Sequence, residues 1–100
     1  MLNNFSPTDR QLKLAKVMES PALKELLKRM EEGFVVRSNH FWHELVTEYG
    51  MSTKAISIRQ IRTLESAGLI EAQEFDDYIE YRITYTGTFE ELVRHETRTS

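Results

Sequence analysis

The chain has no cysteine, so disulfides, thiolate metal sites and cysteine nucleophiles are excluded. Its longest apolar runs are a few residues, whereas a helix that crosses a bilayer needs about 20. The first seven residues lack the basic start and apolar centre of a signal peptide. We therefore expect a cytoplasmic protein with no membrane-spanning segment.

The sequence also lacks an excess of positive charge. Its net charge is −3, which argues against a protein that binds nucleic acids indiscriminately. Only four glycines and two prolines occur, and no segment has the composition of a flexible linker. With 100 residues, 40% of them apolar, the chain is expected to form a single domain, residues 1–100, around one modest core.

What charge there is falls into two adjacent blocks. Residues 51–64 carry Lys54, Arg59 and Arg62 and no acid. Residues 65–87 carry six acids and one arginine, a net charge of −5. Opposite charges on neighbouring segments predict two surfaces with different partners.

Helix-start signals mark the first part of the chain. Both prolines follow a serine, an arrangement typical of a helix N-cap and first turn. The pattern predicts helices over 7–19 and 21–32, the second ending at Gly33, followed by a short strand over 34–36. Asn39 is then expected to cap a helix over 40–49 that ends at Gly50, with Phe41, Leu45 and Tyr49 on its inner side.

The second half predicts a helix, a hairpin and a last helix. Ser52 or Thr53 caps a helix over 54–67, and Gly68 ends it. Strands are expected over 69–75 and 78–85, joined at Asp76-Asp77, because apolar residues alternate with polar ones in the second. A capping box at Thr88 starts a short helix within 88–96. The predicted fold class is α+β, mostly α.

The helix over 54–67 is the main candidate for a binding element. At 100° per residue, Ala55, Ile58, Ile61 and Leu64 form its inner stripe. Arginine can donate two hydrogen bonds to guanine, glutamine can pair with adenine, and hydroxyls and lysine at a helix start suit phosphate. The residues predicted to contact DNA are Ser52, Thr53, Lys54, Ile56, Arg59, Gln60, Arg62 and Thr63.

These motifs resemble the winged helix-turn-helix DNA-binding superfamily. Small prokaryotic, archaeal and phage regulators of the arsenic-repressor and multiple-antibiotic-resistance-repressor kind are the most similar in pattern. The resemblance covers about residues 21–95 and rests on four runs: FWHEL at 41–45, the helix 52–64, LESAGLI at 64–70 and YRITYTG at 81–87. It implies a core over about 21–87 and a homodimer that binds a palindromic operator. The flanking helices 7–19 and 88–96 would make the dimer contact.

The predicted function is sequence-specific binding of double-stranded DNA in transcription regulation, with helix 54–67 in the major groove. The acidic hairpin tip is expected either to stay back from the DNA or to contact a protein partner. The alternative is a winged-helix adaptor or phage or plasmid inhibitor that binds protein without DNA. No catalytic arrangement, cofactor or metal site is expected, because His40 and His43 have only His95 as a further histidine.

Overall fold

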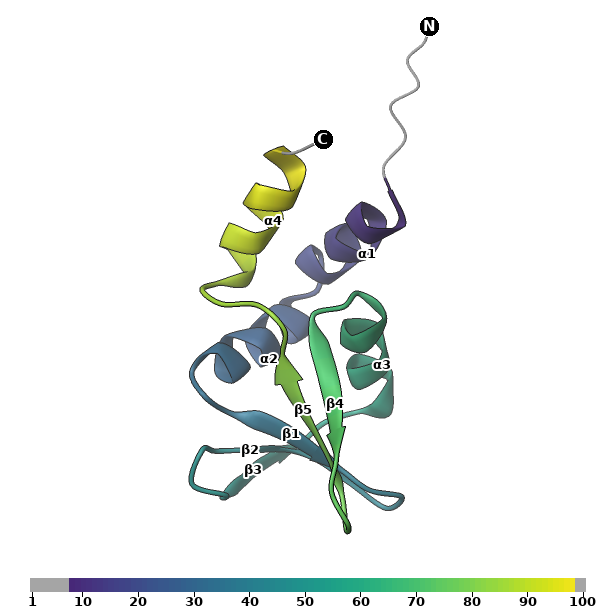
Figure 1. Cartoon of the computed structure of the whole chain (residues 1–100), viewed down its shortest axis with the longest axis vertical. Coiled ribbons are helices and arrows are strands. Elements are labelled where there is room, and N and C mark those ends of the chain that lie inside the picture. Colours follow the sequence, from purple (N-terminus) through teal and green to yellow (C-terminus); the bar gives the residue numbers. More distant parts are fainter. Residues whose placement is uncertain (1–7, 99–100) are drawn as a thin grey trace, which may run out of the picture.

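The computed structural model describes residues 8–98 and shows an α+β fold in which every strand pairing is antiparallel (Figure 1). The elements in this range are α1 (Asp9–Met18), α2 (Pro21–Glu31), β1 (Val35–Ser38), β2 (His43–Val46), β3 (Ser52–Ala55), α3 (Ile58–Ser66), β4 (Ile70–Glu74), β5 (Ile79–Ile83) and α4 (Phe89–Arg98). No helix among these residues is long and apolar enough to cross a membrane.

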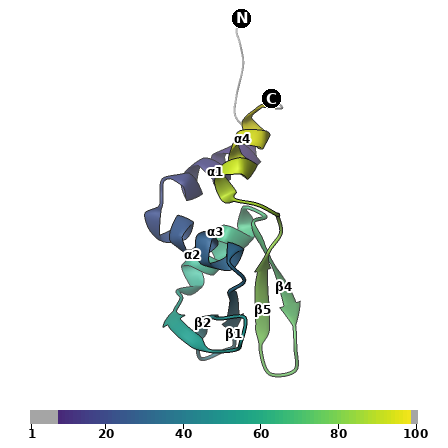
Figure 2. The ribbon, with the colours of Figure 1, turned by 90° about the vertical axis from the view of Figure 1, so that its left-hand side faces the viewer.

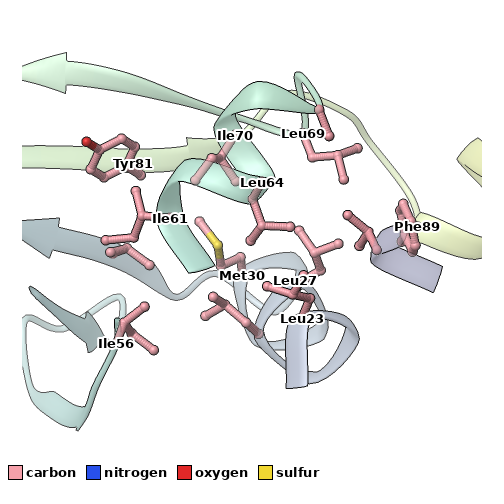
Figure 3. Close-up of a cluster of buried hydrophobic side chains, with 14 of the residues drawn as sticks. Leu23, Leu27, Met30, Ile56, Ile61, Leu64, Leu69, Ile70, Tyr81 and Phe89 are labelled. Atoms are coloured by element: carbon pink, nitrogen blue, oxygen red, sulfur yellow. The ribbon is translucent and has the colours of Figure 1, made fainter. Parts of the chain in front are cut away.

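The five strands form one sheet in the order β3-β2-β1-β5-β4. Val36 on the central strand is completely buried and lies opposite Leu45 on β2 and Tyr81 on β5. Figure 3 shows Tyr81 and Ile70 of the sheet in one buried cluster with Ile61 of α3 and Met30 of α2. Burial of these apolar side chains between the sheet and the two helices stabilises the fold.

The predicted start of the second helix is confirmed, whereas the first helix begins at Asp9, two residues later than predicted. Thr8 caps α1 in a capping box with Gln11, and Ser20 caps α2 by accepting a 3.2 Å hydrogen bond from the Leu23 amide. Pro21 is the first residue of α2, as expected. Pro7 lies outside the described residues.

The helix expected over 40–49 is wrong, because residues 43–46 form strand β2. The Asn39 side chain accepts hydrogen bonds from the Phe41 and Trp42 amides, at 2.7 and 3.0 Å, and so closes a turn where a helix cap was expected. The turn returns the chain alongside β1, so that the β1–β2 hairpin gains a ladder of backbone hydrogen bonds. Phe41 is left 91% exposed at its tip.

The helix expected over 54–67 is wrong at its start, because residues 52–55 form the edge strand β3 and the helix covers only Ile58–Ser66. Ser57 is the N-cap, and its hydroxyl accepts from the Gln60 amide at 3.1 Å. Because the helix starts later, the inner and outer sides predicted for residues 54–58 are wrong. Ile56, expected outside, is 5% exposed, and Ile58, expected inside, is 38% exposed.

The molecule is elongated, with extents of 54, 24 and 22 Å. Helices α1 and α4 lie toward one end, and the loop between β4 and β5 lies at the other (Figures 1 and 2). The expected β4–β5 hairpin and the C-terminal helix are both confirmed.

Candidate nucleic-acid interface

Helix α3 packs its apolar residues into the core and so presents its cations to solvent. Ile61 and Leu64 are completely buried, whereas Arg59 and Arg62 on the other side of the helix are exposed. The capping box between Ser57 and Gln60 satisfies backbone donors at the helix start. The helix is therefore fixed locally as well as by packing, and its outer face is a rigid platform.

A hollow of about 540 Å³ lies between this face and α1. We call it the basic hollow; its lining consists of Lys13, Lys16, Ile58, Arg59, Arg62, Thr63 and Ser66. Four of these seven residues are cations and none is acidic. The only apolar side chain in the lining is that of Ile58.

The four cations of the basic hollow differ in their partners from four other arginines of the fold. Arg10, Arg29, Arg37 and Arg82 each form an ion pair with a glutamate. Within residues 8–98, none of the four hollow cations forms one. Like charges this close repel each other, and an anion placed among them would relieve that repulsion.

Arg10 fixes the relative position of the helices around the basic hollow. Its Nη1 donates to the Ala67 carbonyl at 2.7 Å, just beyond the end of α3, and its Nε pairs with Glu96 of α4 at 3.0 Å. Gly68 follows with φ of +74°, where a Cβ would lie 2.6 Å from Nη1 of Arg10. Lys13 adds a hydrogen bond from Nζ to the Ser66 carbonyl at 3.3 Å. These contacts hold α1 against the end of α3.

Charged side chains of α3 also influence the pKa of Tyr81 on the sheet. Burial raises the pKa of the Tyr81 hydroxyl above its ordinary value, and the Glu65 carboxylate raises it further. The Arg62 guanidinium opposes this pKa shift because it favours the phenolate.

The structure divides the residues predicted to contact DNA. Arg59, Arg62 and Thr63 share the basic hollow. Gln60 uses its Oε1 to accept from the Ser57 amide at 3.2 Å, which occupies the acceptor needed to pair with adenine. Ile56 is buried in the core, so its predicted outward contact is wrong.

The remaining three predicted residues lie on strand β3, outside the hollow. Ser52 donates to Glu44, and the Thr53 hydroxyl donates to the Leu45 carbonyl at 2.8 Å. Thr53 and Lys54 line a separate hollow beside α2. Ser52, Thr53 and Lys54 lie on a strand and not at a helix start. The prediction that free helix amides would help them bind phosphate is therefore wrong.

Sequence reasoning missed Lys13 and Lys16. Their spacing of three residues places both lysines on one side of α1, adjacent to the buried side that carries Leu14 and Val17, and already indicates an exposed basic face. Nothing local indicates that this face lies beside α3. That proximity depends on tertiary packing.

At the far end of the molecule, two hairpin tips lie side by side, since Ser38 pairs with both His43 and Ile79. Phe75 and Tyr78 stack with ring centres 5.0 Å apart, and the Arg37 guanidinium lies 4.9 Å from the centre of the Tyr78 ring. Glu80, 3% exposed, pairs with Arg37 at 3.5 Å and with Arg82 at 2.6 Å. The predicted acidic tip is thus supported by a packed aromatic and ionic cluster.

Among the described residues, no group of three or more histidine, cysteine, aspartate or glutamate side chains is placed to hold a metal ion. Comparison with protein-family models, with curated proteins and with solved structures found no match to this chain.

Proposed function

We propose that this protein is a double-stranded DNA-binding regulator that places the outer face of α3 against the major groove. A helix of nine residues is roughly 13 Å long, and the groove, about 12 Å wide, admits one helix. Arg59 reads base edges with help from Thr63. Lys13, Lys16 and Arg62 hold phosphates on either side.

The observation that carries this proposal is the segregation of charge. A chain of net charge −3 collects four cations from two helices around one hollow, and among the described residues these cations form no ion pair and no acid lines the hollow. Phosphate contacts of lysine and arginine supply most of the affinity of proteins for DNA. The acidic residues of β4 and of the loop after it lie elsewhere, so they do not oppose phosphate at this site.

We further propose that the fold is a variant of the winged helix. Elements α2, β1, α3, β4 and β5 occur in the order expected for that fold. The β2–β3 hairpin occupies the place in the chain where the support helix of a helix-turn-helix was expected. Support for α3 would then come from the sheet and from α1.

The salt dependence of binding tests the phosphate contacts. The parent should bind mixed-sequence duplex at about 50 mM salt, with log affinity falling as log salt rises by about 0.9 per phosphate contact. Lys13→Ala combined with Lys16→Ala should reduce the magnitude of this slope by about 1.8. Fluorescence anisotropy at several salt concentrations measures both quantities.

Lys24→Ala combined with Lys28→Ala is the matched control. These lysines lie on α2 and line a different hollow, and the change in net charge is the same. The proposal fails if the parent does not bind at low salt, or if the control weakens binding as much as the variant of the basic hollow. Selection from a random duplex pool then shows whether Arg59→Ala removes sequence preference.

A second candidate function is protein binding through the hairpin end. Phe41 is 91% exposed on a turn that Asn39 holds rigidly, and Phe75 is 44% exposed on the neighbouring hairpin. Exposed aromatic side chains on rigid supports are typical anchors of protein interfaces. A parent that binds no duplex at low salt would favour this second function.

A further inference from the structure

The end of β4 and the loop that follows it carry an apolar side chain among acids. We call residues 74–77 the acidic tip; Glu74, Phe75, Asp76 and Asp77 are all exposed. Phe75 is held by its stacking on Tyr78, with 23° between the ring planes. The tip is therefore a rigid projection that presents one aromatic ring and three carboxylates.

The basic hollow has the complementary composition. It combines four cations with one apolar side chain, Ile58, which is 38% exposed. Three carboxylates would face four cations that form no ion pair within residues 8–98, and Phe75 would meet Ile58. Charge complementarity would guide the encounter, and contact between the two apolar side chains would add to the affinity.

The two surfaces of one chain cannot meet. The hollow lies where α1 packs on α3, and the acidic tip lies at the end of the molecule farthest from α1 (Figures 1 and 2). Antiparallel pairing with β1 and β4 fixes β5, and hence the tip, in the sheet. An acidic tip that enters the basic hollow must therefore belong to another copy of the chain.

We propose that the acidic tip of one copy docks in the basic hollow of a second copy, head to tail. Because the two surfaces differ, the first contact leaves the hollow of one copy and the tip of the other available. Repeated contacts then build a ring if the rotation closes and an open string if it does not. The association is electrostatic and should weaken as salt screens the charges.

Self-association would also regulate the hollow. Carboxylates of the tip and phosphates of DNA are both anions, so one hollow accommodates one of them at a time. This competition rests on the proposed function, whereas self-association does not. Failure to bind DNA would therefore leave the head-to-tail contact to be tested alone.

Sedimentation velocity of the full chain provides the test. At low salt the average mass should rise above the 11.8 kDa of one chain as the concentration increases, and it should return toward that value at high salt. Asp76→Lys with Asp77→Lys turns the tip from three negative charges to a net +1. Arg59→Glu with Arg62→Glu neutralises the hollow, because Lys13 and Lys16 remain beside two glutamates. Each double variant alone should remain a monomer.

An equimolar mixture of the two double variants is the decisive sample. The unchanged acidic tip of the second variant fits the unchanged basic hollow of the first, whereas the basic tip of the first meets only a neutral hollow on the second. Association should return in the mixture only. Phe75→Ala, which leaves the charge unchanged, should raise the dissociation constant roughly tenfold.

Two matched controls separate this contact from a general effect of charge. Lys24→Glu with Lys28→Glu and Glu19→Lys with Glu90→Lys change the same number of charges on other helical surfaces, and both should associate like the parent. Circular dichroism checks that every variant is folded. A monomeric parent at low salt, association that survives the substitutions in the tip or in the hollow, or a mixture that stays monomeric overturns the proposal.

Discussion

Ile56 and Ile58 are two residues apart and face opposite environments. The Ile56 amide donates to the His43 carbonyl at 2.8 Å, which continues the β-pairing one residue past β3 and turns the side chain into the core. Ser57 then caps α3, and Ile58, in the first turn, points into the basic hollow. The position of the N-cap, Ser57, thus determines that Ile56 packs in the core and that Ile58 lies at the surface.

Substituting each isoleucine by alanine tests this assignment. Ile56→Ala should lower the free energy of unfolding by about 2–4 kcal/mol, because it leaves a cavity in the core. Ile58→Ala should change the same quantity by less than about 0.5 kcal/mol, because its side chain is partly in water. Urea denaturation of both variants measures the difference. Equal losses of stability would mean that α3 begins earlier than Ile58.

Helix starts were predictable where the capping residue is accompanied by a second start signal. Ser20 with Pro21, and Thr88 with Glu91, mark helix starts that the structure confirms. Asn39 is different, because asparagine caps helices and closes turns equally well. The spacing of Phe41 and Leu45 suits one face of a helix and, since four is an even number, one face of a strand as well.

The choice between helix and strand for residues 40–49 depends on β1. β2 gains its hydrogen bonds from a strand that also pairs with β5, and the periodicity of 40–49 carries no information about that sheet. The same limit applies to the candidate site. Arg59, Arg62 and Thr63 could be found on one helix, whereas Lys13 and Lys16 joined them only through tertiary packing.

The start of α4 is held by two carboxylates. Oε2 of Glu31 accepts from the Tyr85 hydroxyl at 2.6 Å and from the Phe89 amide at 2.9 Å, which attaches the helix to α2. Glu91 accepts from the amide of Thr88 at 2.9 Å and from its hydroxyl at 3.2 Å. These bonds to Thr88, amide first, hold the pKa of Glu91 below its ordinary value.

This pKa shift predicts how α4 responds to acid. A carboxyl group whose pKa is lower in the folded state stabilises that state above its unfolded pKa, and the contribution disappears as pH falls through the folded value. The start of α4 should therefore lose protection from amide hydrogen exchange below about pH 4.3. Glu91→Gln should remove this contribution to the pH dependence. An unchanged pH profile in the variant would contradict the role given to the capping box.

At the scale of the whole molecule, the two classes of arginine serve different ends. Arg37 and Arg82 compensate Glu80, a carboxylate with only 3% of its residue surface exposed. Arg59 and Arg62 have no ion pair within residues 8–98 and lie near two lysines in the basic hollow. Arg37 and Arg82 therefore stabilise the fold, whereas Arg59 and Arg62 contribute electrostatic repulsion to it.

Matched double substitutions should separate these classes. Arg37→Gln with Arg82→Gln leaves a buried carboxylate without a cation and should lower the free energy of unfolding by about 1–3 kcal/mol. Arg59→Gln with Arg62→Gln breaks no ion pair and relieves repulsion, so stability should stay within about 0.5 kcal/mol of the parent or rise. Duplex binding should follow the reverse order, with the second variant losing affinity and the first, once folded, retaining it. Thermal denaturation and anisotropy on the same samples give both quantities. A loss of stability in the second variant as large as in the first would show that the hollow arginines are structural, and the hollow would then lose its claim to be a binding surface.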